Sequence, residues 1–227
     1  MVSLRGFAAV LICISLCAYP IWAELNPPLG ILTHAQDAQL NSGAAFPGLS
    51  VFEGETFSTG AEGKLGLRVG PAMLAFSRGA MATLQKVEQG THVDLSSGSV
   101  FFATPQNRMV EVHAADAMLR PELGVLTQAE VRVIGPKILE VSAVRGNLEF
   151  SYRQEYQLIR EGETYRIELD APAEPQKPAG AGAPSISPRK KTVFYIVTGS
   201  VVAGVVARVI HELVEAPESP SHPSKPK

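Results

Sequence analysis

Alternation of apolar and polar residues with a period of two is the feature that most constrains the fold of this chain. Leu65, Leu67 and Val69 alternate with polar or small residues. Three more runs share the pattern, at residues 110–113, 147–152 and 165–170. Side chains alternate between the two faces of a strand, so the pattern predicts strands with one buried face. Glycines separate these runs, and no helical period persists. Residues 24–170 are therefore predicted to form an all-β sandwich or roll of short antiparallel strands.

The first 23 residues have the organisation of a signal peptide. Arg5 precedes an apolar run at residues 7–17, and Ala23 offers a small residue for cleavage. An uncleaved N-terminal anchor is the alternative. Both cysteines of the chain, Cys13 and Cys17, lie in this segment. Its removal would leave a protein without thiols, which excludes disulfides, thiolate catalysis and cysteine-ligated metals.

A second apolar run extends from Thr192 to Ile210. Its 19 residues are about the length of a helix that crosses a bilayer of ~30 Å. We therefore predict a C-terminal transmembrane helix over residues 192–210, through which the chain contacts the membrane. Gly199 and Ala203 are four residues apart and would allow helix-mediated self-association, although small residues also simply fill such helices.

The remaining segments complete the predicted organisation. Residues 171–191 are rich in proline and alanine and are predicted to be an extended linker, and the proline-rich tail at 211–227 is predicted to be disordered. A cleaved signal peptide would place the β domain in the periplasm, on a single-pass protein of the bacterial inner membrane. The basic cluster at residues 189–191 favours the opposite orientation, because positive charges tend to stay in the cytoplasm.

The charge of the predicted β domain argues against nucleic-acid binding. Residues 24–170 contain 18 Asp and Glu against 12 Lys and Arg, a net charge of −6. A phosphate backbone binds basic surfaces, and so we expect no nucleic-acid partner.

The segment at residues 52–70 resembles a site but is better explained as a turn. Gly63 and Lys64 lack the first glycine and the Ser or Thr of a phosphate-binding loop. Glu53 and Glu55 could share one face of a strand, as paired catalytic or calcium-binding carboxylates do. However, the sequence of residues 53–57 returns in similar form at 161–165. A turn between strands explains a repeat better than a catalytic loop does.

No catalytic, cofactor or metal site emerges from the sequence. The histidines of the β domain are His34, His92 and His113. We identify neither a carboxylate nor a second histidine at ligand spacing, and expect surface histidines rather than a metal site. An enzyme of unrecognised type remains an alternative, and its best candidate acids are Glu53, Asp94 and Asp116.

Several glycine and hydrophobic spacings resemble those of the FecR domain family, an extracytoplasmic β module. The segments that carry this resemblance are residues 48–55, 58–60, 63–68, 93–95, 98–102, 110–113 and 139–150, with Gly162 at the last turn. The resemblance covers roughly residues 45–168. The family's Gly-Thr-x-Phe-x-Val element is absent at residues 125–134, and the predicted anchor is C-terminal rather than N-terminal.

With this resemblance, the period-two patterning, the lack of a catalytic constellation and the predicted linker and C-terminal helix lead us to expect a binding or sensory module without catalytic activity. The C-terminal helix would hold it outside the inner membrane. The module's partner would be an envelope protein or a glycan. The different position of the anchor makes control of a sigma factor doubtful. A structural or scaffolding protein of the cell envelope is the alternative from another class.

Overall fold

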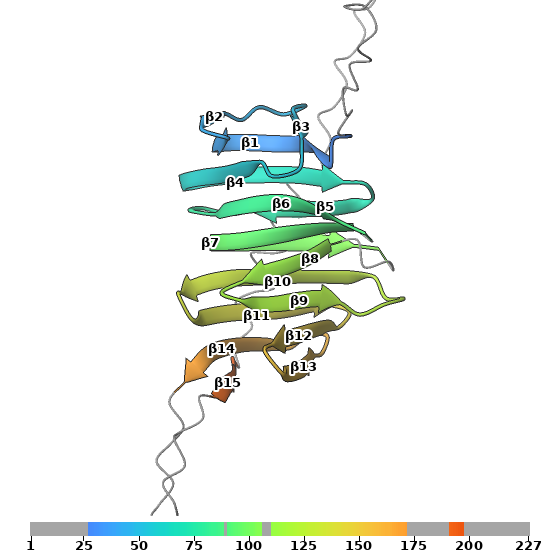
Figure 1. The fold of residues 1–227 in the computed structure, drawn as a ribbon, viewed down its shortest axis with the longest axis vertical. Helices are drawn as coiled ribbons and strands as arrows, with labels where there is room; N and C mark the ends of the chain where they lie inside the picture. Colours follow the sequence, from blue (N-terminus) through green and yellow to red (C-terminus); the bar gives the residue numbers. More distant parts are fainter. Residues whose placement is uncertain (1–26, 89, 106–109, 172–190, 198–227) are drawn as a thin grey trace, which may run out of the picture.

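The chain folds into two β-layers packed face to face (Figure 1). The computed structural model describes residues 27–88, 90–105, 110–171 and 191–197, and these ranges contain strands but no helix. The all-β prediction is therefore confirmed for them. The strands are β1 (Gly30–Leu40), β2 (Gly43–Ala44), β3 (Ser50–Val51), β4 (Thr56–Val69), β5 (Ala72–Phe76), β6 (Met81–Val87), β7 (Gly90–Thr104), β8 (Val110–Ala114), β9 (Ala117–Pro121), β10 (Thr127–Gly135), β11 (Ile138–Arg145), β12 (Leu148–Tyr152), β13 (Glu155–Ile159), β14 (Thr164–Ala171) and β15 (Lys191–Ile196).

The two layers are joined by long strands that pass through both. The front layer contains β6, the first half of β7, β8, β9, β12 and β13, and the rear layer contains β5, the second half of β7, β10, β11, β14 and β15. β7 pairs with β6 and β8 up to Ser97, and with β5 and β10 from Gly98 onward. β4 likewise pairs with both β6 and β5. The described strands therefore form one hydrogen-bonded sheet that is folded over itself.

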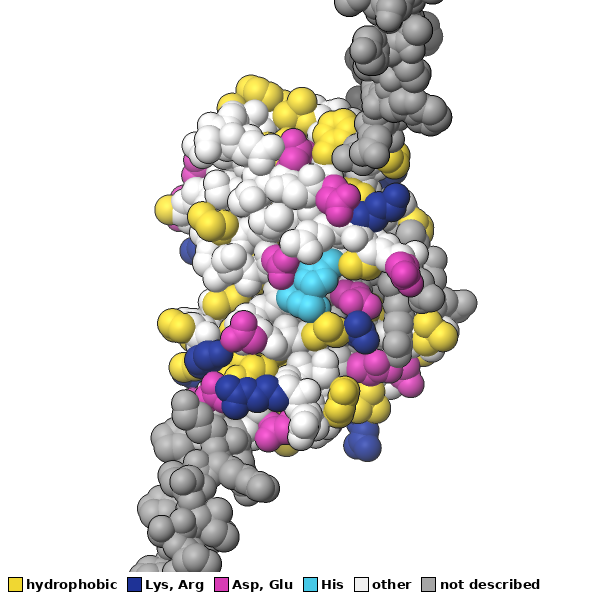
Figure 2. Space-filling view, viewed as in Figure 1, with side chains coloured by type: hydrophobic (Ala, Val, Ile, Leu, Met, Phe, Trp, Pro, Cys, Tyr) yellow, Lys and Arg dark blue, Asp and Glu magenta, His cyan; other side chains and the backbone are white. Residues whose placement is uncertain are grey.

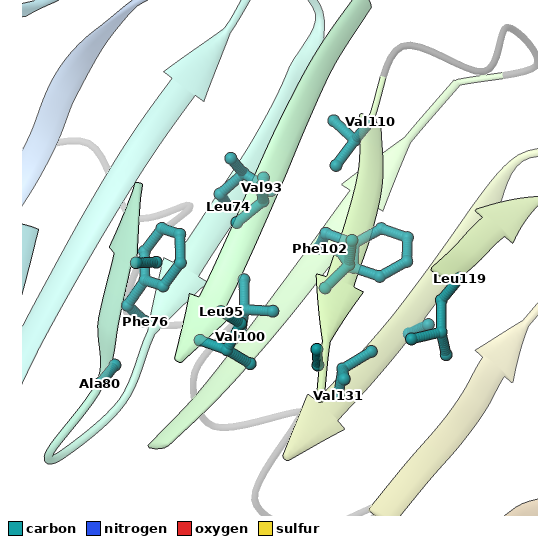
Figure 3. Close-up of a cluster of buried hydrophobic side chains, with 14 of the residues drawn as sticks. Leu74, Phe76, Ala80, Val93, Leu95, Val100, Phe102, Val110, Leu119 and Val131 are labelled. Atoms are coloured by element: carbon teal, nitrogen blue, oxygen red, sulfur yellow. The ribbon is translucent and has the colours of Figure 1, made fainter. Parts of the chain in front are cut away.

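The hydrophobic core lies between the layers and follows the alternation in the sequence. Val93 and Leu95 of β7 are buried, as is Phe102 beyond the corner of the same strand. Figure 3 shows these side chains gathered with Leu119 of β9 and Val131 of β10. Other positions predicted from the alternation are buried as well: Leu65, Leu67, Val69, Val110, Val112, Leu148, Phe150, Tyr152, Ile167 and Leu169. Their burial removes apolar surface from water and supplies the main stabilisation.

β7 and β8 are neighbours that run parallel, which is unusual for strands consecutive in sequence. Thr91 pairs with Val110 and Leu95 pairs with Ala114 in the same direction. The arrangement arises because the second half of β7 lies in the rear layer, so the chain returns to the front layer before β8 begins. The remaining strand pairs are antiparallel.

The two similar sequence segments form two equivalent turns, as predicted. Gly54 and Gly162 both have a φ of 80°, a left-handed conformation that suits glycine. In each turn a glutamate side chain accepts a hydrogen bond from the backbone N–H three residues earlier. Glu55 accepts from Phe52 at 2.8 Å, and Glu163 accepts from Arg160 at 2.9 Å. Each turn leads directly into a strand, β4 or β14, so the repeat is a structural device.

Alanine at either turn glycine should destabilise the protein by a similar amount. No atom lies within 4 Å of a Cβ built on Gly54 or Gly162, so the cost is confined to the left-handed backbone, about 1–2 kcal/mol. Urea unfolding of Gly54→Ala and Gly162→Ala measures it. A loss at one position and none at the other would contradict the equivalence of the turns.

The start of the predicted transmembrane helix is a strand, which corrects the prediction for residues 192–196. β15 pairs with β14 from Lys191 to Ile196. Phe194 of β15 packs edge-on against Phe150 and Tyr165, with ring centroids 5.3 and 6.0 Å apart. The segment is rich in β-branched and aromatic residues, which favour strands. It pairs with the edge of β14.

The other predicted segments lie mostly outside the described residues. These are the signal peptide at 1–23, the linker from residue 172, the rest of the helix at 198–210 and the tail at 211–227. No helix in the described part of the chain is long and apolar enough to cross a bilayer.

Candidate functional site

Two histidines and an aspartate meet on the outer face of the front layer; we call them the His–Asp–His cluster. His92 and Asp94 are two residues apart on β7 and therefore share a face. The parallel pairing places His113 of β8 directly beside Asp94. The Nε2 atom of His92 lies 3.2 Å from Oδ1 of Asp94, and the His92 and His113 rings are 3.5 Å apart at their centroids. One candidate ligand atom from each residue lies within 4.8 Å of the others.

This geometry corrects the expectation of isolated surface histidines. His92 and His113 do lie at outward positions, as predicted, but each has the other histidine and a carboxylate nearby. The His92 side chain is only 14% exposed, whereas that of Asp94 is 43% exposed. Figure 2 shows histidine side chains near the middle of this face, with acidic side chains around them.

His113 is in an unusual state for a histidine near a surface. Its Nε2 atom is buried and has no hydrogen-bond partner among the described residues. The pKa of His113 is lowered, chiefly by burial and then by repulsion from His92, although Asp94 and Glu111 act in the opposite direction. The imidazole therefore stays neutral at pH 7, and a neutral ring nitrogen has a lone pair available.

A second charged pair borders the cluster. Oε1 of Glu111 lies 3.0 Å from Nε of Arg120 on β9, so these two charges balance each other. Within the cluster, neutral His113 contributes no charge to offset the Asp94 carboxylate. The local charge is therefore favourable for a cation.

A hollow of about 330 Å³ opens beside the cluster. Asp94 and His113 form part of its wall, and the turn between β8 and β9 contributes Ala115 and Asp116. The turn between β10 and β11 completes it with Pro136. A molecule in this hollow would contact both a carboxylate and an imidazole of the cluster.

The fold brings two of the three candidate acids, Asp94 and Asp116, to the same hollow. Asp94 belongs to the cluster. Glu53 lies in the turn before β4, where its carboxylate accepts a hydrogen bond from the backbone N–H of Lys86 at 3.4 Å. Asp116 is engaged by Lys137, as described below. Of the other predicted positions, His34 lies on β1 opposite Gly66, and the Gly63-Lys64 pair lies within strand β4 rather than before a helix.

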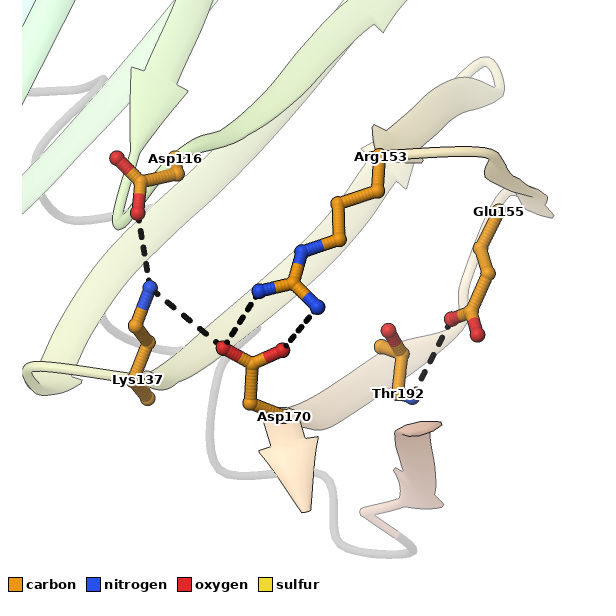
Figure 4. Close-up of polar contacts among 6 residues, drawn as sticks. All are labelled: Asp116, Lys137, Arg153, Glu155, Asp170 and Thr192. Carbon is orange, nitrogen blue, oxygen red and sulfur yellow. Dashed lines mark hydrogen bonds and ion pairs between the residues drawn. The ribbon is translucent and has the colours of Figure 1, made fainter. Parts of the chain in front are cut away.

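Asp116 is part of an ion-pair network at the C-terminal end of the sandwich (Figure 4). Lys137 Nζ lies 2.8 Å from Asp116 and 3.9 Å from Asp170, which also pairs with Arg153 at 2.8 Å. The pKa of Asp116 is lowered, first by its hydrogen bond from Lys137. A general base that works near neutral pH needs the opposite shift. The network therefore joins the turns around β14 and does not resemble an acid–base site.

Two members of the His–Asp–His cluster, Asp94 and His113, belong to a row of outward side chains that crosses the front layer. The row follows the strand pairing through Thr83, Asp94, His113, Met118, Ser151 and Tyr156. It ends on β13, the last strand of the layer, where Tyr156 is 80% exposed and Leu158 is 40% exposed. We call this row, together with Leu158, the front-face row.

No protein-family model matches the sequence, and no curated protein matches it. Among solved structures, the chain is similar to two crystal structures of a candidate anti-sigma factor from Parabacteroides distasonis. One has a TM-score of 0.48 and 12% identity over 70% of this chain and 72% of the other. The second has a TM-score of 0.48 and 11% identity over 69% and 71%. One β architecture serves many unrelated functions, and the resemblance to the FecR domain family stays a prediction.

Proposed function

We propose that this chain is a non-catalytic binding or sensory module on the extracytoplasmic side of a bacterial inner membrane, and that it recognises a protein through the front-face row. The observation that supports the proposal most directly is the exposure of Tyr156 and Leu158 at the outer strand of a polar face. Tyrosine is enriched at protein interfaces because it combines a large apolar area with a polar tip.

The free edge of β13 suits a partner that binds as an extended strand. Among the described strands, β13 pairs only with β12. Its first four residues, from Glu155 to Leu158, are exposed. An edge strand presents unpaired N–H and C=O groups, and an added strand gains affinity from them while side-chain pockets give specificity. Tyr156 and Leu158 point to the same face and would supply that specificity.

We propose a module without catalytic activity because of where the three candidate acids lie. Glu53 and Asp116 each have a hydrogen-bonded role in a turn. Neither belongs to the front-face row, although Asp116 lines the same hollow as Asp94. Asp94 is the single candidate acid that the row contains. Its neighbours are histidines, a combination suited to binding as well as to proton transfer.

Membrane attachment in this proposal rests on the first apolar segment. A membrane helix needs about 20 apolar residues. Residues 191–196 pair in β15, and the Val197 N–H donates a hydrogen bond to the carbonyl of Thr164. The second segment therefore retains 13 residues, 198–210, for that purpose. Residues 1–23 would direct export and, where they are not cleaved, anchor the chain, as in the alternative considered from the sequence.

A single cysteine at the edge of β13 tests both the location and the recognition. The chain has no cysteine beyond Cys17, so Tyr156→Cys is a unique label once Cys13 and Cys17 are changed to serine. We expect a membrane-impermeant maleimide to label this variant in spheroplasts. We also expect a thiol-to-amine cross-linker on the introduced thiol to join the chain to one envelope protein in intact cells.

The matched control is Arg166→Cys, at an exposed position on the rear layer. It should be labelled equally in spheroplasts but should not form the cross-link. Labelling of Tyr156→Cys only after lysis would contradict the extracytoplasmic location. Identical cross-linking from both positions would contradict recognition by the front-face row.

A further inference from the structure

The His–Asp–His cluster has the composition and spacing of a transition-metal site. Two imidazole nitrogens and one carboxylate oxygen are a ligand set found in zinc proteins, with bonds of about 2.0–2.2 Å. In a tetrahedral complex such bonds separate neighbouring ligand atoms by about 3.3 Å. The observed contact between His92 and Asp94 is 3.2 Å, and all three candidate atoms lie within 4.8 Å. Metal binding would require side-chain rotations that close the remaining difference.

The buried nitrogen of His113 is an independent observation that points to a ligand. Buried polar atoms in proteins nearly always have a hydrogen-bond partner, because leaving them without one costs free energy. His113 Nε2 has none among the described residues. A metal ion bound to this nitrogen would satisfy it. The His92 ring, tilted by 49° with its centroid 3.5 Å from that of His113, would bring a second imidazole to the same ion.

The surroundings of the cluster suit one cation with an open coordination position. Glu111 and Arg120 form an ion pair in which the two opposite charges neutralise each other. The Asp94 carboxylate therefore supplies the negative charge that would balance the metal ion. Three protein ligands leave a fourth position free in a tetrahedral site. Asp94 and His113 also border the hollow, from which a fourth ligand could approach.

We propose that His92, Asp94 and His113 bind one divalent ion of the zinc class, with the fourth position open to the adjoining hollow. Imidazole ligands favour zinc over magnesium and calcium, which prefer oxygen ligands throughout. A water molecule or a side chain of a bound partner would complete the coordination. The inference goes beyond the proposed recognition function and does not depend on it.

Titration of the full-length chain in detergent with Zn²⁺, after treatment with a chelator, tests the site. Isothermal calorimetry should show one equivalent of zinc bound by the wild type. Co²⁺ in place of Zn²⁺ should give the visible absorption bands of a tetrahedral site. Mg²⁺ at the same concentration should show no saturable binding.

Two variants and two controls make the assignment specific. His113→Ala and Asp94→Asn should each weaken zinc binding by about 100-fold or more, since loss of even an outer-shell partner costs 10- to 100-fold. Asp94→Asn keeps the shape of the side chain, so a folding defect would not explain its loss. His34→Ala should bind like the wild type, as should the double variant His211→Ala/His222→Ala.

The proposal has a clear failing result. Zinc titrations of His113→Ala and Asp94→Asn that match the wild type would overturn it, and so would the lack of saturable binding by the wild type. Failure here would leave the Tyr156→Cys cross-link unaffected, because that experiment reports on β13.

Discussion

Phe102→Ala should lower the free energy of unfolding by about 3–5 kcal/mol, the usual cost of removing a buried phenylalanine. Phe102 is completely buried and lies where β7 faces both β5 and β10. Its ring fills space between the layers beside Leu119 and Val131 (Figure 3). Alanine would leave a cavity, because the surrounding strands are fixed by hydrogen bonds and relax only in part.

Equilibrium unfolding in urea, followed by circular dichroism, measures this loss. Tyr156→Ala is the matched control, since it removes an aromatic ring from a strand position that is 80% exposed. Its expected effect is within about 0.5 kcal/mol. Equal losses from the two variants would show that the layers do not pack around Phe102.

Gly98→Ala should cost about 3 kcal/mol, from two separate causes. The φ of Gly98 is 75°, which costs an L-residue about 1–2 kcal/mol. A Cβ at this position would also overlap the backbone of Ala80, only 2.5 Å from its nitrogen. Backbone atoms cannot move aside as a flexible side chain can, and such overpacking typically costs a further 1–3 kcal/mol.

Gly124→Ala separates the two causes. Gly124 has a φ of 85°, and no atom lies within 4 Å of a Cβ built on it. It should therefore show only the smaller, conformational loss in the same urea experiment. If Gly98→Ala were no more destabilising than Gly124→Ala, the close approach of β7 to Ala80 would be refuted.

The strands and turns could be predicted from sequence because their signals are local. Val93 and Leu95 alternate with His92 and Asp94, so their division between core and outer face needs no knowledge of the partner strand. The repeated turns could be predicted for the same reason. A glycine and a glutamate at fixed spacing determine the turn at Gly54 and again at Gly162.

The His–Asp–His cluster could be predicted only in part. The spacing of His92 and Asp94 was visible and could have indicated a shared face. The approach of His113 depends on the parallel pairing of β7 with β8. Strands that follow each other in sequence usually pair antiparallel, and no local signal shows that β7 bends into the other layer before β8 begins.

The prediction for residues 192–196 failed because length and hydropathy cannot distinguish a strand from the start of a helix. Val193, Phe194 and Ile196 suit both. The deciding factor is the free edge of β14, together with the aromatic contact between Phe194 and Phe150. Both are tertiary features that an apolar run does not reveal.

The bent strands have a mechanical consequence. In a sandwich of two separate sheets, a ligand could make one layer slide over the other. Here β7 belongs to both layers, and any such sliding would break its backbone hydrogen bonds at the Gly98 corner. A molecule bound to the outer face would therefore not change how the two layers pack against each other. It would act on other proteins through its own surface, or by moving the whole sandwich as one rigid unit. The sandwich would move as a single rigid unit, without a hinge between its layers.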